Sequence, residues 1–120
     1  MASFRLSRPA ENDLLHILAA SQERWGAAGR DRYAATIAEA MRKLAHAPNG
    51  PATRERDELA AGMRSFHLRF ARRREPKAKV RRPVHVLYYR AVAPDLIEIV
   101  RVLHERMEPS KHIGRKIAEK

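Results

Sequence analysis

The chain contains no cysteine, which excludes disulfide bonds, catalysis by a thiolate and zinc sites built from cysteine. Aromatic residues make up only 6% of its 120 residues, so a folded core has few large anchors. No stretch approaches the roughly 18 apolar residues of a membrane-spanning helix, and Met1–Leu6 is too short and too polar for a signal peptide. We therefore expect one cytoplasmic domain over residues 1–120, without contact with a membrane.

Acidic residues are also scarce: 14 Asp and Glu stand against 25 Lys and Arg, which gives a formal net charge of +11. The excess is uneven, because residues 1–63 carry nine basic and eight acidic side chains, whereas residues 64–120 carry sixteen and six. A basic second half favours a polyanionic or acidic partner, such as nucleic acid, a nucleoprotein complex or an acidic protein. The alternative is a solvated surface whose charge only keeps the protein in solution.

Two segments of the first half have the periodicity of amphipathic helices. After a short extended segment at Ser3–Ser7, apolar residues repeat every three or four positions over Ala10–Trp25 and again over residues 31–47. Glycine and proline follow both segments and should end them. Residues 26–29 then form a short connector, which favours an antiparallel helix hairpin.

The second half shows the alternation of β-strands. We expect strands over Met63–Ala71, His85–Val92 and Leu96–His104, with the middle one apolar on both faces and therefore central. In the last strand, one face is expected to carry Ile97, Ile99, Arg101 and Leu103. The predicted fold is α+β: an N-terminal strand and an antiparallel helix hairpin packed on a three- to four-stranded antiparallel sheet, whose other face stays open.

Two segments lie outside this expected core. Residues 72–83 carry seven basic side chains and one acidic one, so their mutual repulsion predicts a projecting basic hairpin insert. An alternative is that residues 72–82 bind a phosphate backbone through charge alone. The tail at 108–120 is expected either to form a short basic helix or to fray.

Several pieces of the sequence together resemble the ParE family of the RelE/ParE toxins. They are Arg24-Trp25-Gly26, Asn49-Gly50-Pro51, the run DELAAGMRSF over 57–66, LYYR over 87–90 and IEIVRVLH over 97–104. The resemblance implies a toxin of a bacterial toxin–antitoxin pair that inhibits DNA gyrase and blocks replication, and that a cognate antitoxin neutralises. It implies a binding protein that needs no cofactor. The basic insert at 72–83 departs from the shorter hairpin expected of this family.

RelE-like relatives with the same fold cut mRNA on the ribosome, and this activity is the main alternative. Cleavage requires a proton to leave the 2′-hydroxyl, charge to be stabilised at phosphorus and the leaving oxygen to be protonated. No tyrosine follows Tyr89 to move a proton. If the chain is a nuclease, we expect its catalytic residues to be His104, Arg64 and Arg101. A second alternative is a basic module that binds nucleic acid without cutting it.

The expected contact surfaces follow from the resemblance and from the strand pattern. The target-binding surface is predicted to comprise Arg64, His67, Arg69, Arg90, Arg101, His104 and Arg106. The antitoxin is predicted to contact Leu14, Leu18, Trp25 and Ile37, as an amphipathic segment lying along the helix hairpin. Both His67 and His104 also fit an ordinary structural role at a strand. The six histidines show no ligand spacing with carboxylates, so no metal site is expected.

Overall fold

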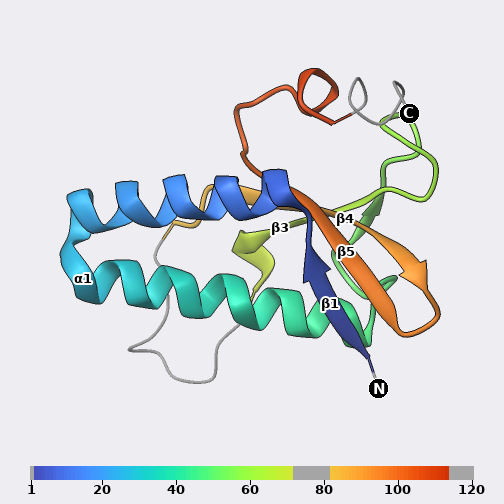
Figure 1. Ribbon diagram of the computed structural model, residues 1–120, viewed down its shortest axis with the longest axis horizontal. Helices are drawn as coiled ribbons and strands as arrows, with labels where there is room; N and C mark the ends of the chain where they lie inside the picture. Colours follow the sequence, from blue (N-terminus) through green and yellow to red (C-terminus); the bar gives the residue numbers. More distant parts are fainter. Residues whose placement is uncertain (1, 72–81, 114–120) are drawn as a thin grey trace.

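The computed structural model describes residues 2–71 and 82–113. Most of the predicted basic insert and the end of the predicted tail therefore lie outside the described residues. The elements are, in order, β1 (Ser3–Leu6), α1 (Arg8–His46), β2 (Arg54–Glu55), β3 (Arg64–His67), the 3-10 turn η1 (Leu68–Phe70), β4 (His85–Ala93), β5 (Leu96–His104) and the 3-10 turn η3 (Pro109–Lys111). Figure 1 shows α1 lying across one face of the sheet.

The five strands form one mixed sheet in the order β1-β5-β4-β3-β2. β1 is parallel to β5, whereas the other neighbours are antiparallel. The predicted α+β class is confirmed, but the prediction of a three- to four-stranded antiparallel sheet is wrong. It missed β2 because two residues show no periodicity. It missed the parallel pair because the direction of β1 depends on where α1 returns the chain.

The helical part is a single element that doubles back on itself. Ser7 caps its start: the Oγ accepts a hydrogen bond from the Ala10 N–H (3.1 Å) and donates to the Val100 carbonyl (2.7 Å), which ties the helix to β5. α1 is helical over 39 residues except at Gly26, whose φ of 75° and ψ of −179° suit glycine almost alone. Figure 1 shows the reversal. The predicted hairpin of two helices with a connector at 26–29 is therefore corrected to one element bent at one residue.

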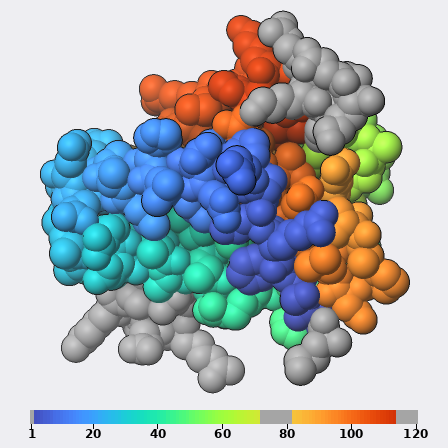
Figure 2. Space-filling model, in the orientation of Figure 1, coloured from blue at the N-terminus to red at the C-terminus, as the bar shows by residue number. Residues whose placement is uncertain are grey.

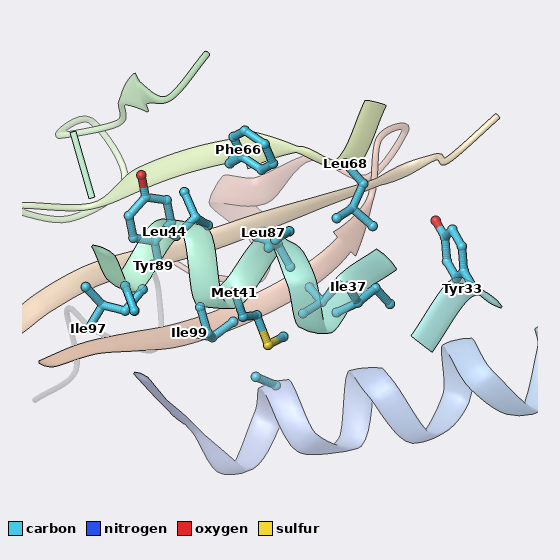
Figure 3. Close-up of a cluster of buried hydrophobic side chains, with 14 residues drawn as sticks. Tyr33, Ile37, Met41, Leu44, Phe66, Leu68, Leu87, Tyr89, Ile97 and Ile99 are labelled. Atoms are coloured by element: carbon cyan, nitrogen blue, oxygen red, sulfur yellow. The ribbon is translucent and has the colours of Figure 1, made fainter. Parts of the chain in front are cut away.

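One hydrophobic core lies between α1 and the sheet, as Figure 3 shows. Its buried side chains are Ala10, Tyr33, Ile37, Ala40, Met41, Leu44 and Ala45 from α1, with Phe66, Leu68, Leu87, Tyr89, Ile97, Ile99 and Val102 from the opposite side. Gly26 divides α1 into a first arm, residues 8–25, and a second arm, residues 27–46. Most of the helical contribution to the core comes from the second arm. Leu14 and Ile17 of the first arm pack only at the margin. The two arms lie side by side in Figure 2, and the first arm keeps much of its surface exposed.

A β-bulge interrupts the expected alternation of β5. In β5, Tyr88 pairs with Arg101 and Tyr89 with Ile99, so Val100 is an extra residue in a β-bulge. Beyond the bulge Val102 joins the core under α1, whereas Leu103 points to the other face. The predicted face of Ile97, Ile99, Arg101 and Leu103 is thus wrong from Val100 onward.

The first predicted strand is also shorter than Met63–Ala71. β3 ends at His67, because the Nδ1 atom of this residue accepts the backbone N–H of Arg69 (2.9 Å) and turns the chain into η1. Phe70, which the alternation placed on the face of Phe66, is consequently 43% exposed.

The sheet face away from α1 is partly covered by the chain after β5. Ile113 is only 1% exposed and packs in a second hydrophobic cluster with Leu59, Met63, Tyr88 and Leu103. Residues 108–113 of the predicted tail are therefore fixed against the sheet by a buried anchor. Within residues 2–71 and 82–113, no helix combines the length and hydropathy that a membrane span requires.

Candidate functional site

A groove of about 380 Å³ lies on the side of the sheet that carries the second cluster. It is lined by Ala52, Arg54, Arg56, Ser65, His67, Arg69, Phe70, Val86, Tyr88, Glu105, Arg106, Met107, Glu108 and Pro109. Four of these residues are arginines, and they come from β2, η1 and the segments after β2 and β5. We call this feature the arginine groove.

Most of the positive charge in the arginine groove is available for a partner. Arg56 is the exception, because its Nε donates to Glu58 (2.7 Å) while its guanidinium lies 5.7 Å from the centre of the Tyr88 ring. Arg69 stacks on Phe70 at 4.8 Å. Within the described residues, the side chains of Arg54 and Arg106 make no hydrogen bond or ion pair, although their charges help to lower the pKa values of Glu58 and Glu105 respectively. The guanidinium groups of Arg54, Arg69 and Arg106 can therefore attract anionic groups of a partner.

The two carboxylates of the groove are already engaged. Glu105 accepts a hydrogen bond from the Nε2 atom of His67 (2.6 Å), and this hydrogen bond holds the pKa of Glu105 below its usual range. Glu108 accepts one from the Ser110 hydroxyl (2.9 Å). Burial raises the pKa of Tyr88, so its hydroxyl is uncharged at neutral pH. The groove therefore presents arginines with little competition from its own acids.

Three histidines at this end of the sheet use Nδ1 as an acceptor. His67 accepts from the Arg69 N–H (2.9 Å) and His104 from the Arg106 N–H (3.1 Å). The Nδ1 atom of His85 lies 2.7 Å from the Tyr33 hydroxyl. That hydroxyl accepts the Val84 N–H (3.2 Å), so its own proton is directed to His85. A neutral imidazole that accepts at Nδ1 carries its proton on Nε2.

The histidine rings also influence one another. His85 and His104 meet edge to face with ring centres 5.6 Å apart. Burial, together with the nearby His104 and His67, lowers the pKa of His85 to about 4. His85 is therefore neutral at physiological pH and serves as part of the structure.

Only three of the seven predicted target-binding residues line the arginine groove: His67, Arg69 and Arg106. The other three arginines are paired elsewhere. Arg101 donates from Nε (2.8 Å) and Nη2 (2.9 Å) to Asp13. Arg64 donates to the Thr53 hydroxyl (2.8 Å), and Arg90 lies 3.7 Å from Glu98. Arg101, Arg64 and Arg90 therefore have partners within the fold and lie outside the lining of the arginine groove.

The predicted nuclease residues do not converge. His104 and Arg101 line a smaller cavity of about 270 Å³ together with Asp13, His16, Ile17, His85, Val102, Leu103, Met107 and His112. Arg64 is not among its lining residues. Although four histidines border this cavity, the described residues include no group of three or more side chains arranged to bind a metal ion.

Of the four predicted antitoxin contacts, three are at least partly exposed and one is buried. Trp25 is 54% exposed at the end of the first arm, and Leu14 and Leu18 are partly exposed. Ile37 cannot serve as a surface contact, because its side chain is buried in the core under α1. Leu15 was missed although it is 68% exposed. The adjacent pair of leucines was the available signal, since both cannot face one core from neighbouring helical positions.

Arg54 and Arg56 were also missed. They lie in a segment whose mixed charges read as a solvated loop, and only the pairing of β2 with β3 brings them beside the groove. A larger groove of about 780 Å³ was unexpected too. It lies at the end of α1 and is lined by Glu39, Arg42, Lys43, Leu44, His46, Ala47, Gly50, Pro51, Ala52, Thr53, Phe66 and Phe70.

Comparisons with known proteins agree on one family. The family model described as "ParE toxin of type II toxin-antitoxin system, parDE" matches residues 4–109. Toxin ParE1 of Caulobacter vibrioides is 31% identical over 114 residues, which cover 95% of this chain and 100% of the relative. A solved chain of the chromosomal ParDE system from P. aeruginosa has a TM-score of 0.61 at 21% identity and shares the fold over 87% of this chain and 96% of its own. The chain therefore belongs to the ParE family of toxins of type II toxin–antitoxin systems.

Proposed function

We propose that this ParE-family toxin acts in the cytoplasm by binding DNA gyrase and blocking replication, and that a cognate antitoxin neutralises it. The observation that carries the proposal is the arginine groove, a concave basic surface without an arrangement for proton transfer. His67 is held by the Arg69 N–H and Glu105. Such a surface suits adhesion to a large anionic complex, of which gyrase on DNA is an example.

Two further observations favour binding over cleavage of RNA. Arg101, a required cation of the predicted nuclease, is held by Asp13, whereas Arg64 donates to the Thr53 hydroxyl, so the two guanidinium groups are engaged with different partners. The Tyr88 and Phe70 rings that line the groove each carry an arginine on a face, so base stacking is hindered. A ribosomal nuclease would need both charge stabilisation and a held base.

The test is a comparison of two targets with the purified toxin. We expect inhibition of supercoiling by DNA gyrase with accumulation of cleaved DNA, and intact mRNA on programmed ribosomes. The variant Arg54→Ala should weaken inhibition about tenfold, since a hydrogen bond to a charged group contributes roughly 1.5–3 kcal/mol. The control Arg24→Ala removes the same charge from α1 and should inhibit like the wild type. Ribosome-dependent cuts with normal supercoiling would contradict the proposal.

We also propose that the antitoxin covers the first arm of α1. Leu15 and Trp25 are the exposed large apolar residues there, and Leu14 and Leu18 of the same arm are partly exposed. An amphipathic antitoxin segment would bury these side chains, and acidic residues on it would complement the net charge of +11. Trp25→Ala should weaken antitoxin binding at least tenfold in calorimetry. Met107→Ala, which changes an exposed apolar residue elsewhere, should bind normally; equal loss in both variants would place the antitoxin on another surface.

A further inference from the structure

The sequence pattern His-x-Arg occurs at the ends of two strands and has the same local structure at both. At the end of β3, His67 accepts the backbone N–H of Arg69 through Nδ1 (2.9 Å). At the end of β5, His104 accepts the N–H of Arg106 in the same way (3.1 Å). Each histidine therefore fixes the turn that follows its strand, and the arginine two residues later leaves that turn in a defined direction.

The topology places the two turns at one end of the sheet. β3 and β5 are both antiparallel to β4, so they run in the same direction and end on the same side. Their arginines line a single groove. The turns are also joined directly, because His67 donates from Nε2 to Glu105, the middle residue of the second pattern (2.6 Å). Two cationic side chains are thus held on opposite parts of one groove by a shared framework.

We propose that Arg69 and Arg106 form a two-armed clamp for the phosphodiester backbone of a nucleic acid, with His67 and His104 as positioning residues. Guanidinium forks match the paired oxygens of a phosphate. Within the described residues neither arm makes a hydrogen bond or ion pair with a carboxylate, although the charge of Arg106 acts on Glu105 and helps to lower the pKa of that carboxyl. Arg54, on the edge strand β2, adds a third cation to the same groove.

The groove favours a phosphate backbone over an acidic peptide. Its floor is a face of the sheet formed by residues such as Ser65 and Tyr88, and the edge strand beside it, β2, has only two residues, which is too short for a peptide to pair along. The Tyr88 and Phe70 rings carry Arg56 and Arg69 on one face, which leaves less apolar surface for an anchoring side chain. Contacts from arginine to phosphate oxygens do not read base identity.

The clamp rests on the proposed function, for which it supplies a contact to the DNA that gyrase holds. The two can fail separately. If the toxin inhibits gyrase and Arg69→Ala/Arg106→Ala inhibits it equally, the clamp is wrong while the gyrase proposal stands. If the wild type binds a labelled duplex through these arginines but leaves supercoiling unchanged, the gyrase proposal is wrong while the clamp stands.

The direct test measures fluorescence anisotropy of a labelled DNA duplex of mixed sequence over a range of KCl concentrations. Arg69→Ala/Arg106→Ala should bind about tenfold more weakly for each arginine removed. Its plot of log affinity against log salt should be shallower by about one unit for each lost phosphate contact. Arg8→Ala/Arg24→Ala has the same net charge and should match the wild type. Residues 72–82 are unchanged in every variant, so equal affinity and slope in the two double variants would overturn the clamp.

The source of the phosphodiester is tested with an RNA duplex of the same sequence. Binding within tenfold of the DNA value, with the same dependence on both arginines, supports recognition of the shared backbone. A larger preference would indicate contacts to sugars or bases and would overturn this form of the clamp. A polyglutamate peptide that displaces the duplex at equal total charge would also overturn it, in favour of an acidic protein partner.

The positioning role is tested at His104. In His104→Asn the side-chain carbonyl can replace Nδ1 as acceptor, so DNA affinity and slow exchange of the Arg106 amide proton should be retained. In His104→Leu the acceptor is lost, the amide should exchange faster and affinity should fall about threefold with an unchanged salt slope. Unaltered exchange and affinity in His104→Leu would show that the histidine does not position the arm.

Discussion

At the scale of single residues, histidine serves this protein as a hydrogen-bond acceptor. His67 and His104 each hold a backbone N–H, and His85 faces the Tyr33 hydroxyl. The sequence singled out His67 and His104 as candidates for target binding or proton transfer, because residue type and position were all that it offered. The tautomer that each ring adopts is set by groups that the fold brings to Nδ1.

His85 makes stability depend on pH. Its pKa is about 4 in the folded protein and 6.5 in the unfolded chain, with burial as the main cause and His104, His67, Glu105 and Tyr33 as its neighbours. Between pH 6.5 and 4 the unfolded chain binds a proton that the folded protein does not, so the free energy of unfolding falls as pH falls. After a discount for the solvent that reaches the ring, we expect a loss of about 2 kcal/mol.

Urea unfolding of wild type, His85→Gln and His46→Gln at pH 7 and pH 4 measures this term. The decrease between the two pH values should be smaller by about 2 kcal/mol in His85→Gln, while the exposed His46 should make no difference. A parallel decrease in all three proteins would show that the His85 ring is accessible to protons in the folded state.

At the scale of elements, local chemistry explains where segments begin and end, while contacts between segments decide their geometry. Ser7 starts α1 and Gly26 reverses it, both as residue type predicts. Gly29 was read as part of a loop, but it is helical, and a Cβ atom there would lie 2.3 Å from the Cβ of Trp25. Glycine is required at position 29 because the two arms approach each other closely there, and the sequence alone does not show this approach.

Replacing Gly26 tests the reversal of α1. Gly26→Ala should cost about 1–3 kcal/mol of unfolding free energy, because alanine resists a φ of 75° with an extended ψ. No atom lies within 4 Å of an added Cβ, so the cost is one of backbone conformation. Ala28→Gly, at an exposed helical site nearby, should cost less than about 1 kcal/mol. Equal melting temperatures for Gly26→Ala and wild type would contradict the assigned backbone geometry.

The ion pair between Asp13 and Arg101 joins the first arm of α1 to β5. Asp13 accepts from two nitrogens of Arg101 and from the Val102 N–H (2.9 Å), and both charged side chains are about 15% exposed, at 14% and 16%. Asp13→Ala should cost about 3 kcal/mol, because it leaves a largely buried guanidinium without its partner. Asp31→Ala breaks an exposed pair and should cost under about 1 kcal/mol. Similar costs in urea unfolding would show that solvent screens the Asp13 pair.

At the scale of the whole molecule, two hydrophobic clusters stabilise different parts of the fold. The larger one holds α1 to the sheet, and the smaller one holds the segment after β5 to the opposite face. This segment forms one wall of the arginine groove through Arg106, Met107 and Glu108. The shape of the groove therefore depends on an anchor outside it.

That anchor is Ile113. Ile113→Ala should lower the free energy of unfolding by about 2 kcal/mol, at the small end for a buried isoleucine because the segment can shift to fill the space. Hydrogen exchange should increase for the amides of Lys111 and Ile113 and change little in β4. Ile17→Ala makes the same substitution at the margin of the larger hydrophobic cluster and serves as the control. Unchanged exchange after residue 108 would contradict the anchoring role.

The sequence by itself determined the α+β class, the position of the helical segments before the long strands, the glycine that ends the first helical segment, the uneven charge and the family resemblance. Each of these depends on neighbouring residues, whose periodicity and backbone preferences act locally. Only the tertiary structure decided that Ile37 is core, that Arg101 belongs to Asp13, that Val100 forms a bulge and that Arg54, Arg69 and Arg106 share a groove. Burial and pairing depend on residues far apart in the chain, and a linear pattern does not specify which of many possible partners the fold brings together.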